Sequence, residues 1–500
     1  MNSGNKIARG VAWTTIANIV NGLYGFVSVP ILIAYFGKAN YGLIGLAMSI
    51  NIYLRLMDLG FSSTNVRYFS DWLAKNDFLK VKRLFQTSLA FYGTLGILNL
   101  IILVIISFFS DSIFNVTQEQ DVVIKHLFYI LSISAFVSWY TSCFDQLVRA
   151  HEYVGWTQKI ALIPKTVQII ILIMTVTVGF TIEWYYALTT FSMFVIIPIM
   201  VSKIKSLCPY ISFRPSLDYG IFKEIVLYSL NIFSFGIFQF SVIHLRPIFL
   251  GIESSPESIT DFRVLDGIFR FVTMLGGSFM GVFLPSATKV VSLHDESSIN
   301  RVIYQGTKYI SIAICFCCFG VMCVVPELLT AYVGADYLYL TIWLDLLLLS
   351  SLRSHNQAIS SLIFADSNVK TLSYLTYTMF FSAIISLLAC WYLIPVYDVG
   401  GTVISFLLFS LIDVLFFYLF YWPKIMHIDS WKVFKTSFAP YFYSGVVVCL
   451  GLRMISLPDV NVWATLLLKG CVFTVIYVLI AYIDMSNEDK QFVQKILGKW

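Results

Sequence analysis

Residues 41–67 place charged side chains inside a segment that is otherwise apolar enough to cross a membrane. Arg55 lies there four residues after Asn51, and Asp58 follows three residues later, between long apolar runs. An ionised side chain near the centre of a bilayer costs about 2.5 to 3.5 kcal/mol on insertion scales, so it needs a watery cavity or a partner. Because Arg55 and Asp58 are one helical turn apart, they can pair. We therefore expect Asp58 to orient Arg55.

The composition extends this constraint to the whole chain. Of the 500 residues, 58% are hydrophobic and 12% are charged, whereas about a quarter of the residues of a soluble domain are charged. A spanning helix needs about 20 apolar residues, and the apolar runs predict about fourteen such helices. The sequence predicts an all-α, multi-pass membrane protein with no soluble domain. We expect spans at about residues 12–36, 41–67, 85–109, 123–147, 160–181, 184–202, 225–250, 262–287, 308–326, 339–364, 371–395, 400–422, 437–457 and 461–484.

The distribution of basic residues predicts the orientation of these spans. An even number of spans places both termini on one side, and the connections on that side contain nearly all of the lysines and arginines. The opposite connections contain essentially Lys38 alone. Because basic residues in short loops stay in the cytoplasm, we expect both termini there. The formal net charge of +5 is small for this length and does not indicate a nucleic-acid partner. The nine cysteines fall almost entirely in apolar segments, which does not favour a metal site.

The longest connection on the cytoplasmic side, residues 203–224, divides the chain into six helices and eight. We expect four parts: an N-terminal lobe (1–203, helices 1–6), a connector (204–224), a C-terminal lobe (225–422, helices 7–12), and helices 13–14 with a cytoplasmic tail (423–500). Transporters are often built from repeated halves. The spacing of Arg55 and Asp58 recurs in Arg263 and Asp266 on the second helix of the second lobe, where Arg270 lies closer to the depth of Arg55.

Polar side chains at membrane depth can line a cavity between two such lobes. Guanidinium groups match phosphate oxygens and stay charged at every relevant pH, so arginines in a cavity would suit an anionic, phosphate-bearing substrate. The alternative is internal pairing, of Arg270 with Asp266 and of Arg353 with Asp345. The candidate cavity residues are Arg55, Arg270, Arg353, Arg246, Asn18 and Asn21, and the other charged residues at this depth include Asp145, Lys165 and Asp413.

Transport also needs an energy source. Carboxylates and histidines at membrane depth can carry a coupling ion, although ion pairs and hydrogen-bonded interior histidines are equally compatible with the pattern. The candidate coupling or orienting residues are Asp58, Asp266, Asp345, His244 and His355. The sequence has no G-x-x-x-x-G-K-[ST] loop to bind nucleotide phosphates. We therefore expect no cofactor, and an ion gradient or the membrane potential as the energy source.

Several short motifs occur in order along this pattern of helices. The chain resembles the bacterial polysaccharide flippases of the Wzx type, in the superfamily that also includes peptidoglycan-precursor flippases and multidrug and toxic compound extrusion proteins. The motifs that carry the resemblance are Gly10 and Trp13, residues 30–37 with Tyr41 and Gly42, residues 58–60 with Arg67, residues 222–230, and residues 326–337.

The resemblance implies two six-helix lobes, two trailing helices and a central cavity. It also implies alternating access that moves an undecaprenyl-pyrophosphate-linked oligosaccharide across the bacterial inner membrane for O-antigen, lipopolysaccharide or other surface polysaccharide. The partners would be this lipid-linked substrate, membrane lipid and other polysaccharide-assembly proteins. Arg55 is the matching cavity position, with Arg270 a looser match. The chain departs from the peptidoglycan-precursor flippases because residues 12–36 contain no Arg or Lys.

Two alternatives remain. A cation-coupled multidrug exporter of the same fold should have a cavity richer in carboxylates. A membrane polysaccharide polymerase, ligase or glycosyltransferase needs a sizeable outer loop or soluble domain, and the predicted outer connections are short. We therefore expect a transporter and not an enzyme, with no catalytic residues.

Overall fold

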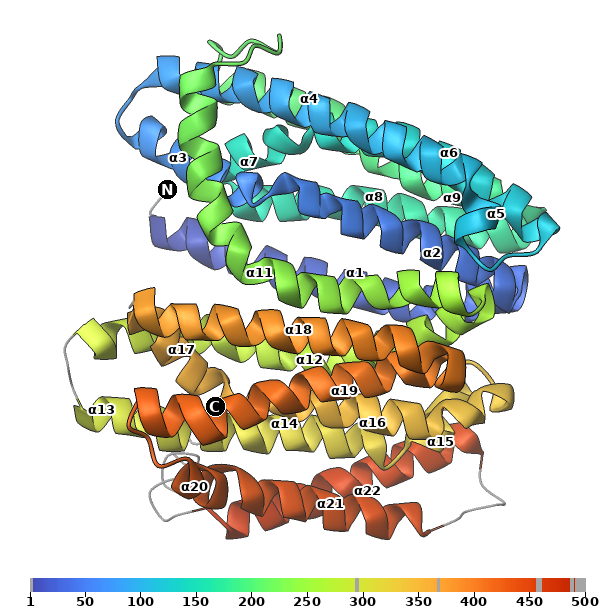
Figure 1. Cartoon of the computed structure of the whole chain (residues 1–500), viewed down its shortest axis with the longest axis vertical. Coiled ribbons are helices and arrows are strands. Elements are labelled where there is room, and N and C mark those ends of the chain that lie inside the picture. Colours follow the sequence, from blue (N-terminus) through green and yellow to red (C-terminus); the bar gives the residue numbers. More distant parts are fainter. Residues whose placement is uncertain (1–2, 293–295, 367–368, 456–460, 486–489, 491–500) are drawn as a thin grey trace. The chain divides into compact units, whose positions relative to one another are not determined.

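A computed structural model describes residues 3–292, 296–366, 369–455, 461–485 and 490. The side chains described are those of residues 12–230, 233, 236–274, 298–363, 373–455, 461–485 and 490. Throughout these residues the chain forms helices and no strand, which confirms the all-α fold (Figure 1).

The helices are long enough to account for the predicted number of spans. In the described part of the chain, eleven helical segments are long and apolar enough to cross a membrane, or twelve if α2 and α3 form one bent span. Helices α11 and α12 have 35 and 37 residues, and at about 1.5 Å per residue each exceeds a hydrocarbon core of about 30 Å. With these two long helices added to the twelve, the described part of the chain is compatible with the predicted number of about fourteen spans.

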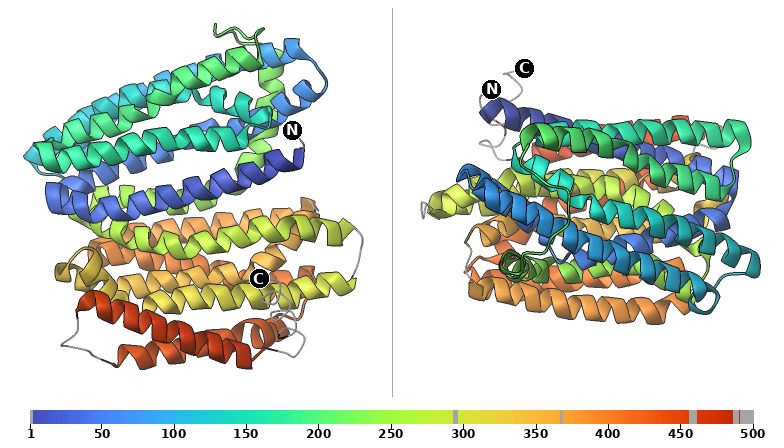
Figure 2. Two further views of the ribbon diagram at one scale, coloured as in Figure 1. Left: turned by 180° about the vertical axis from the view of Figure 1, so that it is seen from behind. Right: turned by 90° about the horizontal axis from the view of Figure 1, so that it is seen from above.

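The chain divides into two compact units, residues 1–263 and 264–500. In the first unit α4 packs along α6, α1 along α8, α3 on α7, and α11 on α2; the first two pairs can be followed in Figure 2. The helices of this unit are α1 (Ser3–Phe36), α2 (Lys38–Leu54), α3 (Phe61–Ala74), α4 (Phe78–Phe108), α5 (Ser110–Ile113), α6 (Gln118–Tyr140), α7 (Ser142–Ala150), α8 (Val154–Met174), α9 (Ile182–Phe191), α10 (Ile196–Leu207) and α11 (Tyr219–Glu253).

Helix α12 (Pro256–Ser292) begins in the first unit and continues into the second. In the second unit α18 packs along α19, α16 on α19, and α14 on α21. Ile359, Phe417 and Trp422 belong to one of its buried apolar clusters. The remaining helices are α13 (Glu296–Arg301), α14 (Thr307–Met322), α15 (Val325–Tyr332), α16 (Thr341–Ser351), α17 (Gln357–Asp366), α18 (Val369–Tyr397), α19 (Val399–Phe416), α20 (Ser430–Val433), α21 (Ala439–Arg453) and α22 (Val462–Ile483). Short 3₁₀ or π segments are Arg55–Asp58, Thr175–Gly179, Ser192–Val195, Val302–Gly306, Ala335–Leu340, Leu352–Asn356, Phe417–Ile425 and Phe434–Phe438.

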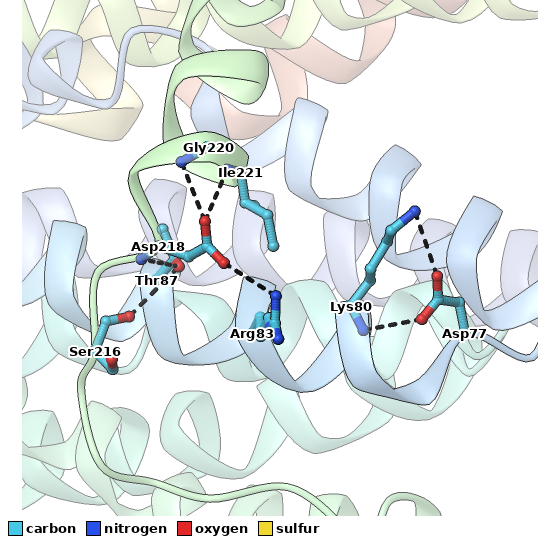
Figure 3. A network of polar contacts seen from close by, with 8 residues as sticks. All are labelled: Asp77, Lys80, Arg83, Thr87, Ser216, Asp218, Gly220 and Ile221. Atoms are coloured by element: carbon cyan, nitrogen blue, oxygen red, sulfur yellow. Dashed lines mark hydrogen bonds and ion pairs between the residues drawn. The ribbon is translucent and has the colours of Figure 1, made fainter.

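The connector between α10 and α11 is held against α4 by a hydrogen bond and an ion pair of Asp218 (Figure 3). The Asp218 carboxylate accepts hydrogen bonds from the backbone N–H groups of Gly220 and Ile221, at 3.1 and 3.2 Å, and so caps α11. The backbone N–H of Asp218 donates to Thr87 Oγ1 at 3.1 Å, and Arg83 lies 3.6 Å from the carboxylate. The connector, residues 204–224, lies within the first compact unit, residues 1–263.

The segment of residues 41–67 is not one continuous helix. Helix α2 ends in a 3₁₀ turn, Arg55–Asp58, and α3 starts at Phe61 after a bend of 46°. Leu59 and Gly60 both adopt left-handed backbone conformations, with φ of 51° and 76°. A glycine adopts such a φ without a steric penalty, whereas a left-handed residue with a Cβ costs about 1–2 kcal/mol. The bend leaves Arg55 and Asp58 at a helix break, where membrane proteins often place binding groups.

Candidate functional site

A cavity of about 430 Å³ lies inside the first unit. Its walls come from α1, α2, α6, α8, α9 and the first turns of α12. Three cationic side chains line it: Arg55, Lys165 and Arg263. Among the described residues that line this cavity there is no Asp or Glu. Its other polar lining residues are Asn21, Tyr24, Ser28, Tyr41, Asn51, Ser134, Ser138, Gln168, Tyr185, Tyr186, Thr189 and Thr190.

Arg55 is exposed to this cavity from the 3₁₀ turn, and its Nη2 donates a hydrogen bond to Ser138 Oγ at 3.3 Å. Within the described part of the chain, no carboxylate forms an ion pair with it. The expected ion pair with Asp58 is therefore wrong. Asp58 accepts hydrogen bonds from the Tyr92 hydroxyl at 2.9 Å and from the Ser62 backbone N–H at 3.1 Å. The start of α3 offers unsatisfied N–H groups, and these engage the carboxylate that spacing alone assigned to Arg55.

A polar network holds Asp58 in place. Gln146 Nε2 donates to the Tyr92 hydroxyl at 2.8 Å, and Asn65 Nδ2 donates to Gln146 Oε1 and Ser88 Oγ, both at 2.9 Å. Asn65, Ser88, Tyr92 and Gln146 are all buried. Because buried hydrogen-bonded networks allow few alternative arrangements, this one fixes the bend between α2 and α3 against α4 and α7.

A second cavity of about 570 Å³ shares Arg55 and Ser138 with the first. Asp58 lines it together with Asp145 and Arg149, which form an ion pair of 2.7 Å between Nε and Oδ2. Arg55 therefore lines both cavities. The charged residues that line the first cavity are all cationic, whereas the second is lined by both arginines and aspartates.

The other two cations of the first cavity rest against aromatic rings. Lys165 Nζ donates to Gln168 Oε1 at 2.8 Å and lies 4.3 Å from the centre of the Tyr24 ring. Arg263 Nε donates to the Tyr41 hydroxyl at 3.3 Å. Lys165 was named only in the wider group of polar residues that could line a cavity, and Arg263 was not named as a cavity residue. Arg263 was recognised only as part of a repeat, because which face of a helix meets the cavity depends on tertiary packing.

The turn between α11 and α12, together with the first residues of α12, packs on α2 next to Tyr41 and Arg263. Lys38 forms an ion pair with the buried Asp261, with Nζ 2.8 Å from Oδ1, and its carbonyl accepts a hydrogen bond from Thr260 Oγ1 at 2.6 Å. Gly42 packs so closely on this turn that a Cβ there would lie 1.8 Å from the carbonyl oxygen of Pro256. Only a glycine fits this contact without movement of the backbone.

The other candidates from the first helices have different surroundings. Asn21 lines the first cavity, whereas Asn18, which is also exposed, does not. Arg246 is 2% exposed, donates from Nε to the Val242 carbonyl at 3.1 Å and lies 5.1 Å from the centre of the Phe262 ring. The structure thus brings Asn21 to the cavity but keeps Arg246 within the packing of α11 and α12.

In the second unit, one of the expected pairs is confirmed and one is wrong. Arg270 Nε lies 2.6 Å from Asp266 Oδ2, as their i,i+4 spacing predicted. Arg353 does not pair with Asp345; its nearest carboxylate oxygen within ion-pair distance belongs to Asp413, 3.9 Å away. The 3₁₀ turn at Leu352–Asn356 points Arg353 toward α19, whose Asp413 it meets.

Asp345 instead forms a bidentate pair with Arg453, with distances of 2.6 and 2.8 Å. Lys469 and Glu327 form another buried pair of 2.6 Å. Sequence reasoning found neither pair, because the partners lie 108 and 142 positions apart and no local spacing connects them.

The two candidate histidines have structural contacts. His355 is buried, and its two ring nitrogens lie 2.7 Å from the Leu352 carbonyl and 2.7 Å from the Tyr418 hydroxyl. The ring of His244 packs on Phe240, with centres 4.2 Å apart. In the described residues no group of three or more His, Cys, Asp or Glu side chains could hold a metal ion.

Sequence and structure comparisons assign the chain to a family. The model of a family described as polysaccharide biosynthesis protein matches residues 7–292, which is more than half of the chain. The chain belongs to this family. A comparison with curated proteins found no match.

Solved structures that share its fold include a flippase and multidrug transporters. A lipid II flippase MurJ in an inward closed conformation matches with a TM-score of 0.71 at 14% identity, covering 95% of this chain and 98% of that chain. An inward-facing multidrug resistance MATE family transporter of the MOP superfamily matches with a TM-score of 0.65 at 11% identity, covering 90% and 100%. The MATE multidrug transporter DinF-BH matches with a TM-score of 0.57 at 15% identity, covering 83% and 94%. The predicted resemblance is confirmed at the level of family and fold.

Proposed function

We propose that the protein is a flippase that moves undecaprenyl-pyrophosphate-linked oligosaccharides across the bacterial inner membrane by alternating access, for O-antigen, lipopolysaccharide or other surface polysaccharide. One observation carries the proposal: the first cavity has three cationic side chains and no described carboxylate in its lining. A cavity with this charge favours a multiply charged anion over a cation. Family membership and the fold shared with a lipid II flippase support a lipid-linked anion.

Arg55 is the residue proposed to hold the pyrophosphate. Its guanidinium forms no ion pair with a described carboxylate, and its one hydrogen bond goes to Ser138. The remaining N–H groups of the planar guanidinium can therefore donate to two phosphate oxygens at once. Lys165 and Arg263 add charge along the same wall, and Asn21 and Asn51 offer amides to sugar hydroxyls. The polyprenyl tail would stay in lipid.

Transport without a nucleotide-binding loop implies coupling to an ion gradient or to the membrane potential. Asp58 is the proposed coupling carboxylate of the first unit, since it faces the second cavity and hydrogen-bonds to Tyr92. With both termini in the cytoplasm, as the basic connections favour, the contact of Lys38 with Asp261 lies at the outer side. The lipid-linked substrate and membrane lipid are the proposed partners, with other polysaccharide-assembly proteins.

The shared fold with MATE transporters makes a cation-coupled multidrug exporter the second candidate. The lack of a described carboxylate in the first cavity counts against cationic drugs as its ligands. We also propose that the protein is a transporter and not an enzyme, because its connections between helices are short.

Deletion of the gene separates these functions. Loss of surface polysaccharide, with lipid-linked repeat units accumulating on the cytoplasmic side, is the expected result. Unchanged surface polysaccharide in the deletion strain would overturn the flippase proposal, and loss of drug export alone would favour the exporter.

Variants of Arg55 then test the site. Charge-assisted hydrogen bonds contribute about 1.5–3 kcal/mol, so Arg55→Ala should lower export roughly tenfold to a hundredfold at equal protein levels, and Arg55→Lys should lower it less. Arg214→Ala is the control, because this exposed arginine contributes its backbone carbonyl, and not its charge, to the contact with Gln86. Full export by Arg55→Ala would show that Arg55 does not hold the substrate.

A further inference from the structure

A groove of about 650 Å³ runs over the surface of the second unit between α16, α19 and the helical segment from Ser430 to Arg453. This volume lies within the range of about 300–1,000 Å³ found for small-molecule sites. Its walls are largely apolar, with Leu411 and Leu415 on one side and Phe434 and Phe438 on the other. All three walls belong to segments apolar enough to cross a membrane. Leu411 and Leu415 on its α19 wall, and Leu419 just beyond the end of α19, are 50%, 53% and 69% exposed, and large exposed apolar side chains on a membrane span indicate a face that meets the hydrocarbon of the bilayer.

The length of the groove corresponds to one leaflet. Its wall runs from Ser430 to Phe442, which is about 18 Å at 1.5 Å per helical residue. That is somewhat more than half of a hydrocarbon core of about 30 Å. A transmembrane helix of a partner protein would need a groove of the full thickness. A hydrocarbon chain of one leaflet fits the length.

The two ends of the groove differ in polarity. At the Ser430 end, Trp431 is 69% exposed, as is typical of an indole at the membrane surface. Lys432 and Lys435 are exposed beside it, and the carboxylate of Asp429 there is engaged by the Lys432 backbone N–H at 3.0 Å. The Ser430 hydroxyl is buried without a hydrogen-bond partner within the described part of the chain.

At the opposite end Arg353 is already engaged. Its guanidinium carbon lies 5.1 Å from the centre of the Phe409 ring, and Nη1 lies 3.9 Å from Asp413 Oδ2. Lys432 and Lys435 outnumber Asp429 at the Ser430 end, whereas Arg353 is matched by Asp413. An anionic headgroup would therefore meet a net positive charge at the Ser430 end and not at the Arg353 end.

We propose that this groove is a binding site for an anionic phospholipid of the leaflet on the Ser430 side. One acyl chain lies between Leu411, Leu415 and Phe434, and the phosphate meets Ser430, Lys432 and Lys435. The site is separate from the cationic cavity of the first unit, and the proposal does not depend on the function assigned to that cavity.

Native mass spectrometry of the full-length protein tests the proposal. The protein in detergent is titrated with phosphatidylglycerol or with phosphatidylcholine of the same acyl chains. Val414→Trp fills the groove, since Val414 lines it, and Val447→Trp adds the same bulk at an exposed position of α21 outside it. We expect Val414→Trp to bind phosphatidylglycerol at least tenfold more weakly than wild type, and Val447→Trp to bind it as wild type does.

The double variant Lys432→Gln, Lys435→Gln tests the headgroup and leaves the groove intact. It should lose the preference for phosphatidylglycerol over phosphatidylcholine while still binding both lipids. It also keeps the proposal testable if Val414→Trp fails to fold. Equal lipid binding by the two tryptophan variants, equal binding of the two lipids by wild type, or a second protein chain in place of lipid would each overturn the proposal.

Discussion

Replacement of Gly42 by alanine should weaken the contact between α2 and the turn that joins α11 to α12. In an ordinary helix this change stabilises a protein by about 0.5–1 kcal/mol, because glycine loses more backbone freedom on folding. Here the new Cβ would lie 1.8 Å from the Pro256 carbonyl oxygen, far inside van der Waals contact, so the backbone has to move. Overpacking of this kind costs about 1–3 kcal/mol. The net expected effect is a loss of stability of up to about 2 kcal/mol.

The matched control is Gly470→Ala, because Gly470 lies within α22 and a Cβ there would meet nothing within 4 Å. Thermal unfolding of the purified proteins in one detergent gives the measurement. Gly470→Ala should unfold at the same temperature as wild type or higher, and Gly42→Ala a few degrees lower, since about 1 kcal/mol shifts the midpoint of a domain by roughly 2–4 °C. The change should also be non-additive with Lys38→Met, because Lys38 belongs to the same contact. A Gly42→Ala protein as stable as the control would refute the close packing.

Further predictions concern a buried pair and a buried thiol. Arg453→Met leaves Asp345 buried without its bidentate partner and should cost about 3–5 kcal/mol of unfolding free energy. Arg270→Met should cost less, about 1 kcal/mol, because the Arg270 side chain is 62% exposed. Thermal unfolding compares the two variants, and equal losses would contradict the assignment. Burial raises the pKa of the Cys208 thiol, so this thiol stays protonated at neutral pH, and its reactive thiolate forms only as pH rises through that raised pKa. Mass spectrometry should find that alkylation of Cys208 is slow at pH 7.5 and becomes faster as the pH rises, and a rate at pH 7.5 equal to that of the same thiol in the denatured protein would contradict its burial.

The sequence predicted the membrane fold well and its local interruptions poorly. Hydropathy counts apolar residues over a window of about one span, so it detected the spans but treated residues 41–67 as one helix. The break depends on Leu59 and Gly60, whose left-handed conformations hydropathy does not register. Asp58, Leu59 and Gly60 were recognised only as a family motif. In physical terms they form the bend.

The charged residues were predictable only where their partners lie on the same helix. Arg270 and Asp266 are one turn apart, and spacing was sufficient to pair them. Asp345 and Arg453 meet across two helices, so their pairing depends on tertiary packing. Arg55 lines a cavity, but the expected ion pair with Asp58 does not form. The Asp58 carboxylate, three residues away, instead accepts hydrogen bonds from the Tyr92 hydroxyl and from the Ser62 backbone N–H at the start of α3.

The break after α2 also explains how Arg55 can remain charged at membrane depth. The last carbonyl groups of a helix have no N–H partner further along the chain, and together they carry roughly half a negative elementary charge. Arg55 is the C-cap residue of α2. The helix end therefore stabilises a cation with a partial charge, where a carboxylate would have neutralised it. The positive charge of Arg55 is therefore retained in the cavity, where we propose that it holds the pyrophosphate of the substrate.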